Sequence, residues 1–78
     1  MAISREQIIQ AVAEKVGPSI TVEVKLEKGV WHITLTKEGK SGSLEFKRGF
    51  IDDYFEKGEY QQEMAFDTRI YKALKALP

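Results

Sequence analysis

Helical spacing of apolar residues marks the first element of the chain. Between residues 5 and 16 the apolar positions recur at three- and four-residue steps, which is typical of a helix with one buried face. These positions are Ile8, Ile9, Val12, Ala13 and Val16. Ser4, with Gln7 three residues later, has the capping-box pattern of a helix start. Gly17 and Pro18 favour a stop after residue 16, so the pattern predicts a helix over residues 5–16.

From Ile20 onward apolar and polar residues alternate, which is typical of strands with one buried face. Residues 20–27 and 30–36 form two such runs, and Lys28-Gly29 between them has the length of a tight hairpin loop. The register that follows opposes Leu26 to Trp31, Val24 to Ile33 and Val22 to Leu35. All the apolar residues of both strands then share one face, which a shift of one residue would destroy.

Alternation resumes at residues 43–48, so the sequence predicts a third strand there. A four-residue loop over residues 38–41 connects it to the second strand. The predicted register opposes Leu44 to Leu35, Phe46 to Ile33 and Arg48 to Trp31. We therefore expect a three-stranded antiparallel meander with one apolar face, which the helix over residues 5–16 covers.

Helical spacing returns after Gly49. Phe50, Ile51, Tyr54 and Phe55 fall on one side of a short helix that Gly58 can terminate, and a longer helix reaches Leu77. The sequence allows two starting points for this longer helix. In one, Asp67 is the N-cap and residues 59–66 form a connection or a fourth strand. In the other, one helix runs from residue 59 to residue 76. Its expected core contacts are Met64, Phe66, Ile70, Tyr71, Leu74 and Leu77.

The pattern as a whole predicts an α+β fold in the order αβββα, with one or two C-terminal helices packed on one sheet face. With 78 residues, residues 1–78 are expected to form a single small domain. The chain has no cysteine and one histidine, which excludes disulfide scaffolds, thiol chemistry and metal sites built from Cys or several His. We expect no cofactor and no metal.

So short a chain leaves little room for the pocket of about 300 to 1,000 Å³ that small-molecule sites usually occupy. We therefore expect no small-molecule substrate and no enzymatic activity. No stretch of the sequence resembles a signal peptide or a membrane span, so we expect a cytoplasmic protein without a membrane partner.

Charge is balanced at 12 basic and 12 acidic residues, but it is unevenly distributed. Residues 50–67 carry six acids against Lys57 alone. The same segment is rich in aromatic residues, which are common in protein interfaces. We therefore predict a small adaptor or regulatory module that binds another protein or a second copy of itself through residues 50–66. The predicted contact residues are Asp53, Tyr54, Phe55, Glu56 and Tyr60.

The alternative function is contact with nucleic-acid phosphates. The predicted register places Lys25, His32 and Lys47 in one row on the outer face of the sheet. The alternative site consists of this row together with Lys37, Lys40 and Arg48. Because Trp31 and Phe46 are predicted on the buried face, base stacking is not expected and nucleic acid is the less favoured partner.

Overall fold

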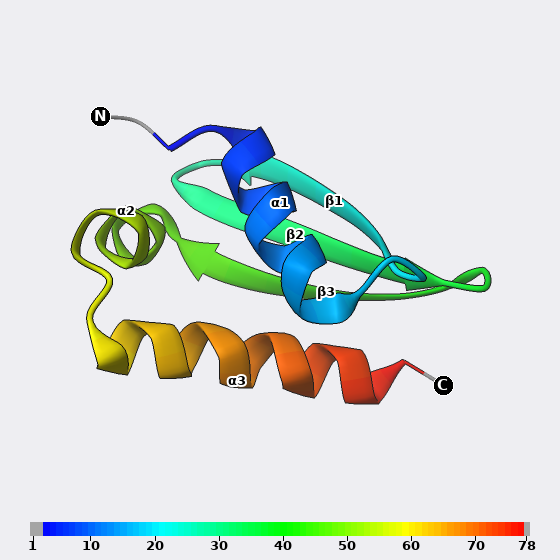
Figure 1. The fold of residues 1–78 in the computed structure, drawn as a ribbon. Helices are drawn as coiled ribbons and strands as arrows, with labels where there is room; N and C mark the ends of the chain where they lie inside the picture. The colour runs from blue at the N-terminus through cyan, green and yellow to red at the C-terminus, as the bar shows by residue number, and fades with distance from the viewer. Residues whose placement is uncertain (1–2, 78) are drawn as a thin grey trace.

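A computed structural model describes residues 3–77, and its six elements follow in the predicted order. They are α1 (Arg5–Val16), β1 (Thr21–Glu27), β2 (Val30–Lys37), β3 (Lys40–Lys47), α2 (Arg48–Lys57) and α3 (Tyr60–Ala76). The strands form an antiparallel sheet in the order β1-β2-β3. Figure 1 shows α1 crossing one face of this sheet, with α3 running alongside β3. The predicted α+β fold is confirmed.

The start of α1 is fixed by reciprocal side-chain hydrogen bonds. The Gln7 backbone N–H donates to Ser4 Oγ at 3.2 Å, and the Ser4 backbone N–H donates to Gln7 Oε1 at 2.8 Å. This capping box satisfies two backbone donors that a helix start otherwise leaves unpaired. The helix ends at Gly17, and it buries Ile8 and Val12 against the sheet, as predicted.

Both hairpins use two-residue turns. Lys28 and Gly29 have φ values of 51° and 76°, and Glu38 and Gly39 have values of 52° and 80°. Positive φ at both central positions is the signature of the turn whose twist matches that of paired strands. The first turn produces the predicted pairing of β1 with β2, including Leu26 opposite Trp31 and Val24 opposite Ile33.

The predicted pairing of β2 with β3 is wrong by two residues, because the second loop has two residues rather than four. Leu44 lies opposite Ile33, Phe46 lies opposite Trp31 and Gly42 lies opposite Leu35. Arg48 does not pair with Trp31, since it is the first residue of α2. A shift of two residues keeps every side chain on its predicted face but changes its neighbours across the sheet.

Residues after Gly58 form one helix, so the start at Asp67 and the fourth strand are both wrong. Gly58 itself ends α2 in the left-handed conformation with φ of 60°, as predicted. Phe66 and Ile70 of α3 are buried, as predicted, and Leu74 and Leu77 pack at the edge of the core. Met64 and Tyr71 are exposed, contrary to prediction, because the helix turns them away from the face that carries Phe66.

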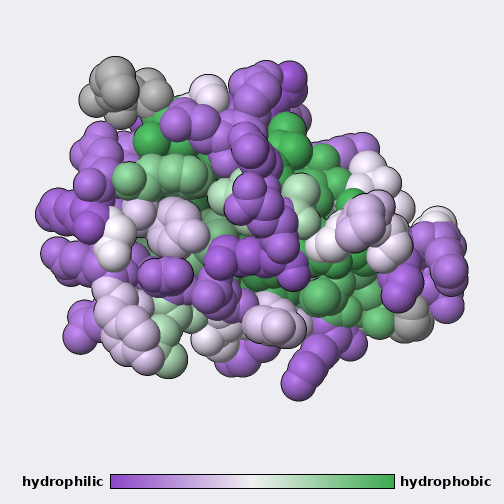
Figure 2. All heavy atoms as spheres, in the orientation of Figure 1, coloured by the Kyte–Doolittle hydropathy of each residue, from purple (hydrophilic) through white to green (hydrophobic). Residues whose placement is uncertain are grey.

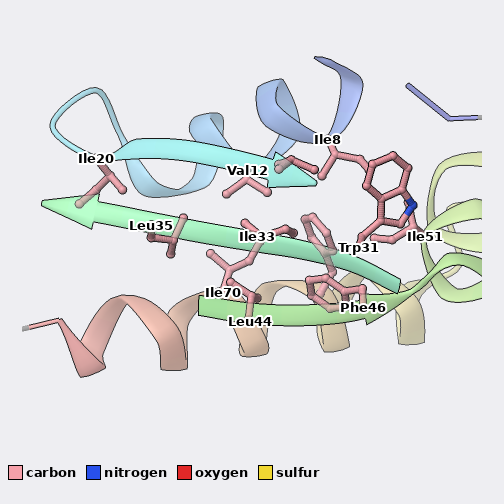
Figure 3. Close-up of a cluster of buried hydrophobic side chains, with 12 residues drawn as sticks. Ile8, Val12, Ile20, Trp31, Ile33, Leu35, Leu44, Phe46, Ile51 and Ile70 are labelled. Atoms are coloured by element: carbon pink, nitrogen blue, oxygen red, sulfur yellow. The ribbon is translucent and has the colours of Figure 1, made fainter. Parts of the chain in front are cut away.

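The core lies between the apolar sheet face and the helices (Figure 3). An aromatic cluster fills its end near α2. The Phe46 ring stacks on Phe50 at 5.2 Å and on Phe66 at 5.1 Å between ring centroids, and Tyr54 stacks on Phe66 at 4.3 Å. These contacts tie α2 and α3 to the end of β3.

Within residues 3–77, no helix combines the length and apolar character needed to cross a membrane.

Candidate functional site

The aromatic residues predicted for protein binding divide into a packed pair and an exposed one. Tyr54 and Phe55 are half-buried, and their rings meet edge to face at 5.1 Å. Burial raises the pKa of the Tyr54 hydroxyl above its ordinary value. Tyr60, in contrast, is 74% exposed. Tyr54 and Phe55 therefore help hold α2 against α3, whereas Tyr60 presents its ring to solvent.

The two predicted acids lie on α2 in different surroundings. Asp53 is half-buried, and its carboxylate lies 3.8 Å from Lys57 Nζ one turn later. Glu56 is exposed. The five predicted contact residues therefore do not form one continuous exposed patch, since only Glu56 and Tyr60 among them are exposed.

The largest exposed apolar side chains of α3 lie on one helix face. Tyr60, Met64 and Tyr71 are 74%, 50% and 61% exposed, respectively. Their spacings of four and seven residues correspond to whole helical turns, so their side chains follow one line along the helix. We call these three residues the α3 stripe. Of its members, only Tyr60 is among the contact residues predicted from the sequence.

A groove between α1 and α3 borders the α3 stripe. Its volume is about 170 Å³, and it is lined by Lys15, Asp67, Ile70, Tyr71 and Leu74. Tyr71 belongs to both the groove and the α3 stripe, so the two surfaces are continuous. Figure 2 shows hydrophobic side chains gathered beside the C-terminal end of α1, on a face that is otherwise largely hydrophilic.

One ion pair crosses the floor of this groove. Lys15 Nζ lies 2.5 Å from Asp67 Oδ1 and 5.8 Å from the centroid of the Phe66 ring. The hydrogen bond to Asp67 raises the pKa of Lys15, although partial burial acts in the opposite direction. The groove therefore has apolar walls with one cation and one carboxylate between them.

The predicted basic row on the outer sheet face is wrong, because the true register brings an acid into it. His32 lies opposite Glu45, with Nδ1 3.2 Å from Glu45 Oε1, and Lys47 lies opposite Val30. Lys25 remains beside His32, but its Nζ lies 3.5 Å from Glu27 Oε2. Carboxylates therefore accompany two of the six residues proposed to contact phosphate.

The other four residues of the alternative site lie in two separate groups. Lys37 and Lys40 flank the second turn, whereas Lys47 and Arg48 lie at the opposite end of β3. Seven residues of strand between Lys40 and Lys47 span about 23 Å. The structure thus separates the basic residues that the sequence analysis expected to act together.

Within residues 3–77, no group of three or more His, Cys, Asp or Glu side chains is arranged to hold a metal ion. Comparison of the chain with protein-family models, with curated proteins and with solved structures finds no match.

Proposed function

We propose that this chain is a non-catalytic module that binds another protein through the α3 stripe and the adjoining groove. The observation that carries the proposal is the alignment of three large, exposed apolar side chains along one face of α3. Single exposed apolar residues are common on protein surfaces, but several large ones aligned on one helix face are typical of contact sites. Tyrosine and methionine are also among the residue types enriched in interfaces.

The charges around the Tyr60 end of the α3 stripe indicate the chemistry of the partner at that end. Glu59 and Glu63 lie beside Tyr60 at the start of α3, and the exposed Glu56 lies at the end of α2. Opposite charges steer association and fix the orientation of a complex. We therefore expect a partner with apolar side chains that enter the groove and with Lys or Arg at their border.

A pair of designed peptides tests this proposal. The first is an amphipathic helix with leucine on one face and lysine on the other, and the second has glutamate in place of every lysine. The isotopically labelled protein is titrated with each peptide and followed by NMR. We expect the lysine peptide to shift the amide signals of Tyr60, Met64 and Tyr71, and the glutamate peptide to bind much more weakly.

Matched variants make the result specific to the α3 stripe. The double variant Tyr60→Ser and Met64→Ser is expected to lose binding of the lysine peptide. Gln61→Ser, at an exposed position next to Tyr60, is expected to retain it. Equal binding by both variants, or shifts confined to other elements, would refute the proposal. Salt-dependent shifts at Lys37, Lys40, Lys47 and Arg48 with duplex RNA or DNA would favour the nucleic-acid alternative instead.

A further inference from the structure

The outer edge of β1 carries backbone groups that no strand within residues 3–77 pairs. Residues of an antiparallel strand direct their N–H and C=O groups alternately to either side. The two-residue turn makes Glu27 and Val30 the hydrogen-bonded pair that closes the first hairpin. The backbone N–H and C=O groups of Glu23 and Lys25 therefore also point toward β2. Those of Val22, Val24 and Leu26 point away from β2, toward the open edge.

We propose that β1 pairs with β1 of a second copy of this chain, in antiparallel orientation and centred on Val24. The two-fold axis then passes between the two Val24 residues, perpendicular to the sheet. Val22 of each copy lies opposite Leu26 of the other, and all three outward-facing residues find hydrogen-bonding partners. Two sheets of three strands become one continuous sheet of six.

Charge complementarity selects this register. Glu23 of each copy lies opposite Lys25 of the other, so two pairs of opposite charges form on the outer face. Only shifts by an even number of residues keep the outward-facing backbone groups paired. A shift by two in one direction opposes Glu23 to Glu23, and a shift by two in the other direction opposes Lys25 to Lys25. Both neighbouring registers thus oppose like charges.

The apolar side of the junction is incompletely covered in a single chain. Leu26 is 42% exposed, and Val22 and Ile9 are half-buried. A hollow of about 390 Å³ beside this edge is lined by Arg5 and Ile9 of α1, by Val22 and Val24, and by four polar residues of the outer sheet face, which are Glu23, Lys25, His32 and Thr34. Because the axis is perpendicular to the sheet, both apolar faces lie on the same side. Pairing therefore brings Leu26 of one copy against Val22 of the other.

β1 lacks two of the features by which proteins protect an exposed edge. Thr21–Glu27 contains no proline, and each of its residues has one partner on β2, so the strand has no bulge. Its charged side chains disfavour registers that oppose like charges, whereas the proposed register opposes Glu23 to Lys25. The edge of β3 differs. A hollow beside it is lined by Ser43, Arg69 and Lys72, so pairing two β3 edges would bring the basic side chains of two α3 helices together.

The test is the oligomeric state of charge variants, measured by sedimentation equilibrium over a range of protein concentrations. We expect the wild-type chain to dimerise. Each single variant, Glu23→Lys or Lys25→Glu, places like charges opposite one another in both of the cross-strand pairs at the junction. Each is expected to raise the dissociation constant of the dimer about tenfold or more. The double variant Glu23→Lys and Lys25→Glu restores opposite charges and is expected to restore dimerisation. Ser43→Lys on the edge of β3 is the matched control and is expected to change nothing.

Cross-linking tests the register directly, because the chain has no cysteine of its own. Glu23 and Lys25 occupy non-hydrogen-bonded positions of the proposed junction, where facing side chains approach most closely. A mixture of Glu23→Cys chains and Lys25→Cys chains is expected to form disulfide-linked heterodimers in oxidised glutathione, faster than either chain forms homodimers.

Two outcomes would overturn the proposal. One is a wild-type chain that stays monomeric up to millimolar concentration, and the other is a dimer that responds equally to the single and double charge variants. Circular dichroism of each variant establishes that it is folded. The double variant Tyr60→Ser and Met64→Ser is expected to dimerise like the wild type, so failure of the β1 junction and failure of the α3 stripe are distinguishable.

Discussion

Lys15 Nζ and Asp67 Oδ1 lie 2.5 Å apart and link the first helix of the chain to the last. The ammonium group also lies 5.8 Å from the centre of the Phe66 ring, which is fully buried. The pair thus lies at the boundary between the groove and the core. A charge at this position is less screened than one on the open surface, so the ion pair is expected to contribute measurably to stability.

Lys15→Met is expected to lower the free energy of unfolding by about 1 kcal/mol, because it leaves the Asp67 carboxylate without its cation. Urea unfolding monitored by the fluorescence of Trp31, which is 5% exposed, measures this change. Asp67→Asn and the double variant complete a cycle that isolates the interaction. Lys75→Met, at an exposed position of α3, is the control. A coupling energy of zero would contradict the assigned role.

Stability is expected to fall at alkaline pH. The folded state raises the pKa of Lys15 and of Tyr54 above their ordinary values of 10.5 and 10.0. The unfolded chain therefore releases both protons at lower pH than the folded protein does. The contribution of each group to stability is complete below its ordinary pKa. It is lost as the pH rises through the higher pKa that the group has in the folded protein.

Unfolding by urea at neutral pH and above pH 10 measures this loss. Lys15→Met and Tyr54→Phe each remove one titrating group, so each variant is expected to lose less stability than the wild type between the two conditions. Tyr60→Phe removes an exposed phenol and serves as the control. Equal losses in all four proteins would contradict the prediction.

Gly42 is expected to tolerate alanine but not a long side chain. A Cβ atom at this position would lie 3.4 Å from Leu77 Cδ2 and 3.7 Å from the Ala73 carbonyl oxygen, which is ordinary van der Waals contact. Gly42→Ala is expected to change stability by less than about 1 kcal/mol. Gly42→Leu has to displace the end of α3 and is expected to destabilise by about 1 to 3 kcal/mol.

Thermal unfolding of both Gly42 variants measures these effects. Ser41→Leu, one residue earlier in β3 and on the opposite face of the strand, controls for the added side chain because Ser41 is exposed on the outer face of the sheet. A Gly42→Leu variant as stable as the wild type would show that α3 does not pack on this part of β3.

The contact between His32 and Glu45 is expected to contribute little. Both side chains are substantially exposed, and cross-strand ion pairs of this kind contribute about 0.2 to 1 kcal/mol. Glu45→Gln is therefore expected to lower the free energy of unfolding by less than about 1 kcal/mol. The effect should shrink in high salt. Chemical denaturation at low and high salt measures both quantities, and a larger loss that is independent of salt would contradict this interpretation.

Local signals were sufficient to predict α1 and the first hairpin. The capping residues of α1 and the Lys28-Gly29 turn act within a few residues of chain, so their effect is visible in the sequence. The second turn repeats the pattern, with Gly39 where the first has Gly29. The polar Lys40 and Ser41 resemble loop residues, because Gly42 interrupts the apolar alternation that identifies a strand. The predicted β2–β3 register is therefore wrong by two residues. It assigns each side chain to the correct face of the sheet but to the wrong neighbours on the adjacent strand.

The start of α3 and the exposure of its residues depend on tertiary structure. Glu59 at the N-cap makes no side-chain hydrogen bond to the helix, so no local signal marks the start. Met64 and Tyr71 have large side chains of a kind that cores also contain, but helical spacing places both away from the face that carries Phe66 and Ile70. A helical projection of residues 60–76 separates Met64 and Tyr71 from Phe66 and Ile70.

The two short turns also bear on how the protein folds. Each strand of the meander pairs with its immediate neighbour in the chain, so forming the sheet requires only small loops to close. Docking α3 onto α1, in contrast, joins segments separated by the whole sheet. Folding rates rise when native contacts are local in sequence. We therefore expect the hairpins to form early, and the late step to be the closure that brings Lys15 to Asp67.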